Sequence, residues 1–372
     1  MPTVLQIRAG EKMLGAERVV LDIATHSEHF GYRSIVAMPW DHGNPEPELL
    51  RMCRDAGVQT ISLRGSSQFS VRPIFALRQA LRREGVDVIH AHGYREDLYA
   101  LASTRGQALV ATNHLWKRTT PRLRLYAALD LRLLRRFDEV VAVSQPIADE
   151  LAEAGTSSVT KIFNGVSTER VSRRLSGPAA RAERRRLGLP EDQALVAMVS
   201  SLTPEKGHTL ALSAIQRLKT LDFSVAIVGD GPLQKSLQRD AQRRGLESHV
   251  HFLGRRADVP EILAVTDIYL MTSYQEGLPI SLLEGMAAGC AVVSTAVGEI
   301  GSVIESEAQG LLTTTEPDSI AKALDRLVRD QAFREELARG AQSRVREHFS
   351  AHEMTRNYCA IYDRALHTKS TG

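Results

Sequence analysis

Short apolar segments alternate with helical segments along almost the whole chain, and this alternation strongly limits its possible folds. The first series of apolar segments begins at residues 3–7 and ends at residues 160–163, and segments with helical spacing lie between them. A second series begins at residues 195–199 and ends at residues 311–313. Strands that alternate with helices of this length form parallel sheets with helices on both faces. The pattern therefore predicts an α/β protein with two doubly wound, Rossmann-like domains.

A polar, basic stretch over residues 167–193 interrupts the alternation between the two series. It is rich in Ser, Arg, Gly and Pro, and residues 179–187 have the composition of a short, very basic helix. We predict an N-terminal domain over residues 1–166, a linker region over residues 167–193 and a C-terminal domain over residues 194–349. The length of 372 residues also favours two domains, because single cores rarely grow beyond about 250–300 residues.

The composition excludes several classes of protein. Apolar residues make up 43% and charged residues 24% of the chain, as in a soluble globular protein, and the net charge of +3 does not indicate a nucleic acid partner. Cys53, Cys290 and Cys359 are widely spaced, which indicates reduced thiols rather than a disulfide framework. The sequence has no apolar run of about 18 residues and no secretory signal pattern, so we expect a cytoplasmic protein.

The stretch over residues 273–296 carries the strongest indication of function. It begins as a loop, becomes a helix whose first residue is Pro279, and ends at Gly289 before a β-branched strand. Glu276 in the loop and Glu284 in the helix can both flank a ligand at the helix N-terminus, where free N–H groups favour anions. Since carboxylates bind hydroxyls rather than phosphates, this spacing indicates a phosphate that carries sugars on both sides.

These glutamates and the Gly-Met-Ala-Ala-Gly sequence that follows them resemble the donor-site motif of retaining GT-B glycosyltransferases of the GT4 type. A buried core helix is the alternative interpretation. The resemblance implies two Rossmann-like domains that face a central cleft, with the nucleotide-sugar donor in the C-terminal domain. It also implies that a final helix, over about residues 350–372, packs back on the N-terminal, acceptor-binding domain. Within the motif, the implied donor-binding residues are Glu276, Gly277, Leu278, Pro279, Ile280 and Glu284.

Residues 202–208 follow a strand and resemble the Arg-Leu-x-x-x-Lys-Gly element of this family, whose Arg and Lys grip the donor diphosphate. Lys206 matches the Lys, whereas Ser201 stands at the position of the Arg. Arg255 and Arg256 follow another strand and resemble the segment that frames the nucleobase. Either arginine could replace the missing charge, stack on a base, or lie on the surface.

Three glycines resemble further parts of the donor site. Gly229 and Gly231 follow a strand, as in the Gly-x-Gly-Pro turn of the family, where glycine permits either close approach to a ligand or a tight turn. Gly15 follows the first strand and matches the Gly-Gly-x-Glu loop of the family in part, because Leu14 stands at the first glycine position. We expect all three glycines to line the donor.

The N-terminal domain carries a looser resemblance. Residues 89–94 end an apolar strand and resemble the His-x-His element of the family, whose second histidine, here His92, lies beside the reacting sugar. His90 and His92 share one face of the strand, so both could line a pocket, and a hydrogen-bonded core position is the alternative. The expected acceptor-side residues are His114, Tyr94 and Asn164.

The resemblance implies a retaining transfer, for which a front-face route through an oxocarbenium-like state is usually proposed. His92, Glu276 and Lys206 are the expected catalytic residues, and His92 would position the sugar and stabilise charge rather than attack. We expect no metal or other cofactor, because no Asp-x-Asp lies at a strand end and no His/Cys cluster has metal-ligand spacing. Lys206 and helix N-termini would neutralise the leaving diphosphate instead.

Residues 117–136 form a basic segment that is predicted to be helical from Pro121 onward, with seven basic residues and one acid. Apolar and aromatic residues interleave with them, so the segment could lie on an anionic membrane surface. A solvated face and an acceptor-phosphate patch are the alternatives. The membrane interpretation would bring a cytoplasmic enzyme to the inner membrane face.

We therefore predict a glycosyltransferase that moves a sugar from a nucleotide-diphosphate sugar to a sugar, lipid-linked or small-molecule acceptor. The product would be a polysaccharide, glycolipid or other glycoconjugate. A catalytically inactive GT-B subunit stays open as an alternative, because Ser201, Leu14 and the Gly301-Ser302 pair depart from the family pattern. A nucleotide-sugar epimerase with the same fold is a lesser alternative, since it fits the two-glutamate helix less well.

Overall fold

The structure is a computed structural model that describes residues 1–10, 13, 15–40, 43–63, 71–114, 120–168, 171, 174–218 and 222–371. The chain divides into two compact units. The first unit is formed by Met1–Gly165 together with Ala351–Gly372, and the second by Val166–Ser350. Each unit is described below by itself.

Seven of the described strands form one parallel sheet in the first unit, in the order β3-β2-β1-β4-β5-β6-β7. β1 pairs with β2 on one side and with β4 on the other, so the strand order reverses direction between β1 and β4. The bounds are β1 Thr3–Ile7, β2 Arg33–Pro39, β3 Gln59–Leu63, β4 Val88–Ala91, β5 Ala108–Asn113, β6 Glu139–Ala142 and β7 Val159–Lys161.

Helices cover both faces of this sheet, because successive strand residues point to opposite sides. Leu5 and Ile7 pack with α3, α4, α5 and α6, whereas Val4 packs with α1 and α15 on the other face. The described helices are α1 Gly15–His26, the short η1 Ser27–Phe30, α2 Glu48–Asp55, α3 Arg72–Glu84, α4 Tyr94–Ser103, α5 Pro121–Leu134, α6 Gln145–Glu153 and α15 Ala351–Thr371.

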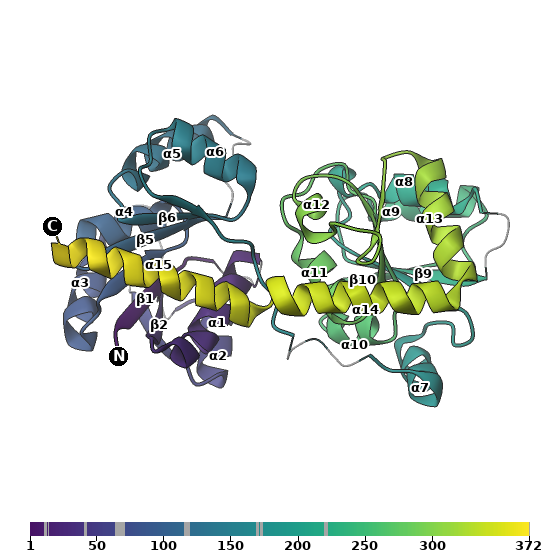
Figure 1. The fold of residues 1–372 in the computed structure, drawn as a ribbon, viewed down its shortest axis with the longest axis horizontal. Helices are drawn as coiled ribbons and strands as arrows, with labels where there is room; N and C mark the ends of the chain where they lie inside the picture. The colour runs from purple at the N-terminus through teal and green to yellow at the C-terminus, as the bar shows by residue number, and fades with distance from the viewer. Residues whose placement is uncertain are drawn as a thin grey trace. The chain divides into compact units, whose positions relative to one another are not determined.

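Helix α15 belongs to the first unit although the whole second unit precedes it in the sequence. Figure 1 shows it in yellow, running along the strands of the first sheet. Met354, Tyr358 and Tyr362 are buried in one cluster with Val4 and Val110 of the sheet. An ion pair between its Arg364 and Glu139 of β6, with N–O distances of 3.1 and 3.0 Å, adds a polar contact at the edge of this cluster.

Six of the described strands form a second parallel sheet, in the order β10-β9-β8-β11-β12-β13. Their order reverses direction between β8 and β11, which are paired neighbours. The predicted pair of doubly wound α/β domains is therefore confirmed. The bounds are β8 Ala194–Val199, β9 Phe223–Val228, β10 Val250–Gly254, β11 Ile268–Met271, β12 Ala291–Thr295 and β13 Leu311–Thr313.

The largest apolar cluster of the second unit joins α8, α9, α13 and α14 to one face of the sheet, and a smaller cluster joins α7 and α10 to the other. None of the helices that the structure describes is both long and apolar enough to cross a membrane. The described helices are α7 Gly177–Leu187, the short η2 Pro204–Lys206, α8 His208–Ile215, α9 Gln234–Arg243, α10 Val259–Ala264, α11 Ile280–Ala287, α12 Ile300–Val303, α13 Pro317–Arg329 and α14 Gln331–His348.

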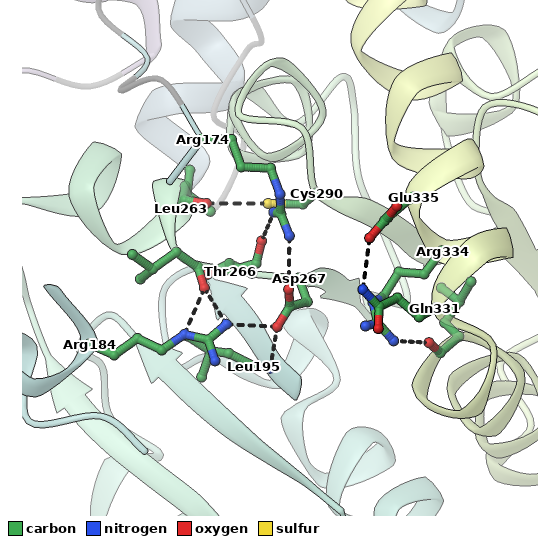
Figure 2. Close-up of polar contacts among 12 residues, drawn as sticks. Arg174, Arg184, Leu195, Leu263, Thr266, Asp267, Cys290, Gln331, Arg334 and Glu335 are labelled. Atoms are coloured by element: carbon green, nitrogen blue, oxygen red, sulfur yellow. Dashed lines mark hydrogen bonds and ion pairs between the residues drawn. The ribbon is translucent and has the colours of Figure 1, made fainter. Parts of the chain in front are cut away.

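The stretch that we predicted as a linker region, residues 167–193, is part of the second unit. Asp267, directly before β11, accepts from Arg174 at 2.8 Å and from Arg184 of α7 at 2.7 Å, as Figure 2 shows. The Arg184 guanidinium also donates to the carbonyl oxygen of Val265 at 2.7 Å, and its side chain is 9% exposed. The described part of this stretch from Arg174 onward is therefore packed structure rather than a free connector.

Candidate functional site

The reversal in strand order between β8 and β11 brings two loops together at the carboxyl ends of the second sheet. One loop, residues 200–207, connects β8 to α8, and the other, residues 272–279, connects β11 to α11. Ligands of open parallel sheets bind in the crevice at such a reversal. Six of the predicted donor residues lie in these two loops, namely Ser201, Lys206, Glu276, Gly277, Leu278 and Pro279.

Backbone contacts hold the two loops against each other. Gly207 has a φ of +67°, a left-handed conformation that favours glycine, and a Cβ there would lie 1.9 Å from the carbonyl oxygen of Thr272. Oγ1 of Thr272 donates to the carbonyl oxygen of Gly207 at 2.9 Å, and the N–H of Tyr274 donates to the carbonyl oxygen of Glu205 at 2.8 Å. This close approach places Lys206, which lies between Glu205 and Gly207, beside the loop after β11.

Lys206 and Glu276 form an ion pair across the two loops. Nζ of Lys206 lies 2.8 Å from both carboxylate oxygens of Glu276, and Oγ of Ser273 donates to Oε1 of the same carboxylate at 2.6 Å. The side chain of Glu276 is 6% exposed and that of Lys206 is 22% exposed. An ammonium group can bind a phosphate, and a carboxylate can accept hydrogen bonds from hydroxyls, so the pair presents both functions at one point.

The loop that carries Glu276 is also held from the side of β12. Oγ1 of Thr295 donates to the carbonyl oxygen of Ser273 at 2.6 Å. Gly298, which was not predicted as a site residue, has a φ of +55°, and a Cβ there would lie 2.0 Å from the carbonyl oxygen of Glu276. The position of this carboxylate is therefore set by the strands on both sides of β11.

Helix α11 begins one residue later than predicted, at Ile280, and Pro279 is its N-cap rather than its first residue. Glu284 lies in the second turn and is half-buried. Gly285 packs closely on the ring of Tyr269 in β11, because a Cβ there would lie 2.6 Å from Cδ2 of that ring. The glycine after the second glutamate therefore lets α11 pack closely on the sheet beneath the site.

The two glycines after β9 are required by packing within the domain. Gly229 has a φ of +140°, and a Cβ there would lie 1.9 Å from the carbonyl oxygen of Ser200. A Cβ at Gly231 would lie 2.5 Å from the carbonyl oxygen of Leu202. Both glycines thus let the loop after β9 lie against the loop after β8, and their contact with a donor stays a prediction.

The two predicted arginines lie away from Lys206 along the sheet. They follow β10, which β9 separates from β8. Arg256 forms a bidentate ion pair with Asp258, with N–O distances of 2.7 and 2.6 Å, and Arg255 is exposed. The structure therefore places Ser201 in the loop of Lys206 and both arginines after β10, two strands along the sheet.

His208 was not predicted as a site residue, although it directly follows the Lys-Gly pair of the motif. It is the first residue of α8 and is 1% exposed, and its Nε2 lies 3.2 Å from Oγ of Ser200. Nδ1 of His208 is buried and has no hydrogen-bond partner in the part of the chain that the structure describes. Burial, and then the charge of Lys206, lowers the pKa of His208 to about 4, so the ring is neutral at pH 7.

The first sheet has a similar reversal between β1 and β4. Arg8 follows β1, His92 follows β4, and His114 follows β5, and these strands are neighbours. Nε of Arg8 donates to Oε1 of Glu17 at 2.7 Å, and its Nη1 donates to the carbonyl oxygen of His92. The structure therefore brings two of the predicted histidines together with an arginine that was not predicted.

His92 is completely buried, and both of its ring nitrogens are engaged within the first unit. Its Nδ1 lies 3.1 Å from Nε2 of His114, and its Nε2 lies 2.8 Å from Oε1 of Gln6. Burial, and then the neighbouring His90 and His114, holds the pKa of His92 well below its usual range. His92 therefore has, in this structure, the hydrogen-bonded core position that was the alternative interpretation. Its contact with a donor sugar stays a prediction.

His90 has the hydrogen-bonded core position, one of the two interpretations left open for it. His90 lies within strand β4, which ends at Ala91. The His90 ring is completely buried, with Nδ1 2.8 Å from the hydroxyl of Tyr362 and Nε2 2.7 Å from Oγ1 of Thr112. His114, by contrast, is partly exposed, and burial, followed by the charge of Arg8, lowers its pKa to about 3.

The remaining predicted residues of the first unit are spread over several elements. Tyr94 begins α4, is half-buried, and has its ring centroid 6.2 Å from that of Tyr126. Asn164 follows β7, and its Oδ1 is buried without a hydrogen-bond partner among the described residues. Gly15 is the first residue of α1, and Leu14 lies outside the described residues.

Helix α5 contains much of the described part of the basic segment, of which Lys117 and Arg118 lie outside the described residues. Leu125 and Leu129, one turn apart, are 58% and 45% exposed. The exposed basic residues of the helix and its C-terminal end are Arg122, Arg124, Arg132, Arg135 and Arg136. Apolar and cationic side chains are therefore both exposed on this helix.

Buried carboxyl groups connect α5 to α4, and they were not predicted. Asp97 on α4 is 2% exposed and Asp130 on α5 is 1% exposed. Burial, and then the charge and hydrogen bond of Asp130, raises the pKa of Asp97 well above its usual range. Burial also raises the pKa of the neighbouring Glu96. Two carboxyl groups are therefore buried where the two helices pack, and the pKa of Asp97 is raised there.

Two protein-family models match the chain. The model described as "Glycosyl transferases group 1" matches residues 180–344, and the model described as "Glycosyltransferase Family 4" matches residues 14–170. The two matches fall on the second and the first unit, respectively, and together they span most of the sequence.

Individual relatives agree with these matches. The chain is 29% identical to a D-inositol 3-phosphate glycosyltransferase of Salinispora tropica over 77% of this chain, and the match spans 61% of that protein. It is 26% identical to the N-acetyl-alpha-D-glucosaminyl L-malate synthase of Bacillus anthracis, over 80% of this chain and 79% of that protein. Its fold is similar to that of Anabaena Alr3699/HepE in complex with UDP-glucose, with a TM-score of 0.78, 22% identity, and 97% and 99% of the two chains covered.

Proposed function

The chain belongs to the glycosyl transferases group 1 family and has the GT-B fold, and we propose that it moves a sugar from a nucleoside-diphosphate sugar to a hydroxyl acceptor. The observation that carries this proposal is the Lys206–Glu276 pair at the β8/β11 reversal. It combines a cation for a diphosphate with a carboxylate for sugar hydroxyls.

Donor binding would exchange the partners of this pair. Lys206 would turn from Glu276 to the diphosphate, and the N-terminus of α11 would supply further N–H groups to the same anion. Glu276, which Ser273 holds at 2.6 Å, would accept hydrogen bonds from the sugar, and Glu284 would accept them from the ribose. A solved relative of this fold has UDP-glucose bound, which makes uridine nucleotides the first donors to test.

The transfer would proceed with retention of configuration at the anomeric carbon. The bond from that carbon to the phosphate oxygen breaks, a bond to the acceptor oxygen forms on the same face, and the acceptor proton passes to the leaving phosphate. Lys206 and the α11 N–H groups would stabilise the charge on the leaving diphosphate, so no metal ion is required. The acceptor would be a sugar, a small polyol or a lipid-linked glycan.

The exposed surface of α5 supports a peripheral location at an anionic membrane, on the cytoplasmic side. Leu125 and Leu129 could enter the interface, while the arginines of the same helix meet acidic head groups. This location suits an enzyme that builds a polysaccharide, glycolipid or other glycoconjugate on a lipid-linked acceptor.

The test is a transfer assay with purified protein, a panel of nucleoside-diphosphate sugars, and sugar, polyol and lipid-linked acceptors. We expect release of nucleoside diphosphate that depends on the acceptor, and a product with the anomeric configuration of the donor. Conversion of the donor without an acceptor would indicate an epimerase. Nucleotide binding without any turnover would indicate an inactive subunit, the alternative that Ser201 leaves open.

A further inference from the structure

The second unit has a cavity of about 1160 Å³ at the amino ends of its strands. The cavity is lined in part by Ala194, the first residue of β8, and by Asp267, directly before β11. Asp222 and Gly289, which precede β9 and β12, also line it. The donor loops follow the opposite, carboxyl ends of β8 and β11, so the cavity is separate from the donor site. None of its described lining residues was predicted as a site residue.

The lining of this cavity, which residues of α7 and α14 complete, is polar and carries both charges. Six arginines, five acidic residues and three glutamines contribute to it. Its described lining residues include no aromatic side chain on which a nucleobase could stack. The excess of one positive charge suits a ligand with a single anionic group rather than a polyanion or a nucleotide.

Part of this charge is already neutralised within the fold. Asp267 accepts from the guanidinium groups of Arg174 at 2.8 Å and of Arg184 at 2.7 Å, as Figure 2 shows. Two cations share this one carboxylate, so the cluster keeps one positive charge. Four further charged lining residues are ion-paired, in the pairs Arg181–Asp192, Arg185–Glu191 and Arg329–Asp325.

Two arginines of α14 that line the cavity have no carboxylate partner in the part of the chain that the structure describes. Arg339 is exposed, and the described residues give it neither an ion pair nor a hydrogen bond. Nη1 of Arg334 donates to backbone carbonyl oxygens, at 2.6 Å in the case of Leu327. Glu335, next to Arg334 in the sequence, accepts from Nε2 of Gln331 at 2.9 Å (Figure 2) and has no cation partner among the described residues. Guanidinium groups and a carboxylate are therefore both available to a ligand in this cavity.

We propose that this cavity is a second ligand site, which binds a polyhydroxylated molecule with a single anionic group. Arg334 and Arg339 bind the anionic group, because the planar guanidinium fork matches the oxygens of a phosphate or a carboxylate. The carboxylates of Glu335 and of the exposed Asp222 can only accept, so they bind hydroxyls of the ligand. These carboxylates repel an anion that has no hydroxyls. A sugar phosphate and a uronic acid of a glycan share the required chemistry.

The test is calorimetric titration of the full chain with matched probes, namely glucose 6-phosphate, glucuronate, glucose and inorganic phosphate. At least one of the two anionic sugars should bind about tenfold more tightly than both glucose and inorganic phosphate, because it alone uses both sets of groups. Preference for glucose 6-phosphate would indicate a sugar phosphate as the ligand, and preference for glucuronate a uronic acid of a glycan. Equal affinity for inorganic phosphate, or no binding of either anionic sugar, would overturn the proposal.

Three substitutions at exposed positions of α14 locate the binding. Arg339→Gln should weaken it about tenfold, whereas Arg346→Gln, on the same helix but outside the cavity lining, should change it less than about twofold. Glu335→Ala removes a negative charge and would tighten the binding of a bare anion, but it should weaken that of the anionic sugar about fivefold, since a hydroxyl loses its acceptor. Unchanged affinity in Arg339→Gln, a gain in Glu335→Ala, or displacement of the sugar by a nucleoside diphosphate would overturn the proposal. The titration requires no turnover, so a failure of sugar transfer would leave its result standing.

Discussion

Replacement of Glu276 by Gln should tighten the binding of a free nucleoside diphosphate and at the same time slow sugar transfer. In the structure, Nζ of Lys206 lies 2.8 Å from both carboxylate oxygens of Glu276. A diphosphate must compete with this carboxylate for the ammonium group. Gln keeps the shape of the side chain and an oxygen for Ser273, but it removes the competing charge.

The size of the effect follows from the burial of the pair. Exposed ion pairs contribute about 0–1 kcal/mol, and buried hydrogen bonds to charged groups contribute about 1.5–3 kcal/mol. With side chains 22% and 6% exposed, the Lys206–Glu276 pair lies between these cases. Release of about 1 kcal/mol corresponds to roughly fivefold tighter binding. Transfer should fall at least about tenfold, because the amide is a weaker acceptor for sugar hydroxyls.

Calorimetric titration with the nucleoside diphosphate, without a sugar, measures the first effect. Glu205→Gln is the matched control, because it removes a negative charge from the residue next to Lys206. Glu205 is exposed and accepts from Oγ1 of Thr203 at 2.7 Å, so its removal releases no ion pair of the lysine. Unchanged or weaker binding by Glu276→Gln, or an equal gain in both variants, would refute this reasoning.

Three further predictions concern the rest of the molecule. Glu284→Ala should weaken nucleotide binding by about 1.5–3 kcal/mol, since a buried hydrogen bond to a charged group would be lost, and calorimetry with unchanged affinity would contradict the assignment. Replacement of Arg132, Arg135 and Arg136 by Gln should reduce sedimentation with acidic vesicles, since each basic side chain near such a surface contributes about 1 kcal/mol; equal recovery of wild type and variant would leave α5 a solvated face. The raised pKa of Asp97 means that the folded state binds more protons, so stability should fall as pH rises above the usual carboxyl range toward the folded pKa. Asp97→Asn should flatten that fall and raise the melting temperature at pH 7, and an unchanged pH profile of melting would count against the raised pKa of Asp97.

The repeating pattern of the sequence was sufficient to predict the architecture, because apolar residues recur with different periods in strands and in helices. The predicted strands at residues 3–7 and 311–313 have the same bounds in the structure. Residues 167–193 were harder to predict. Their polar composition suggested a connector, whereas Arg174 and Arg184 fix the stretch to Asp267, a contact that no local pattern reveals.

The site could be predicted in part for the same reason. Motif spacing indicated Lys206 and Glu276 separately, but their direct pairing joins residues that are 70 positions apart. A histidine at the end of a buried strand has the same local sequence whether it faces a ligand or the core. His92 is hydrogen-bonded to Gln6, and Gln6 to Tyr362, which lies 356 positions after Gln6 in the chain, so periodicity alone could not predict this core position.

The discontinuous first unit has a consequence for how the protein is made. Its sheet is complete once residue 165 has been synthesised, but α15, which covers one face, follows the whole of the second unit. At about 5–20 residues per second, the sheet waits roughly 10–40 seconds for that helix. During this interval Val4, Val110 and their neighbours lack the apolar partners Tyr358 and Tyr362, and His90 lacks the hydroxyl that it bonds in the finished molecule. The contiguous second unit, although it is translated later, is therefore the first of the two that can reach its final form.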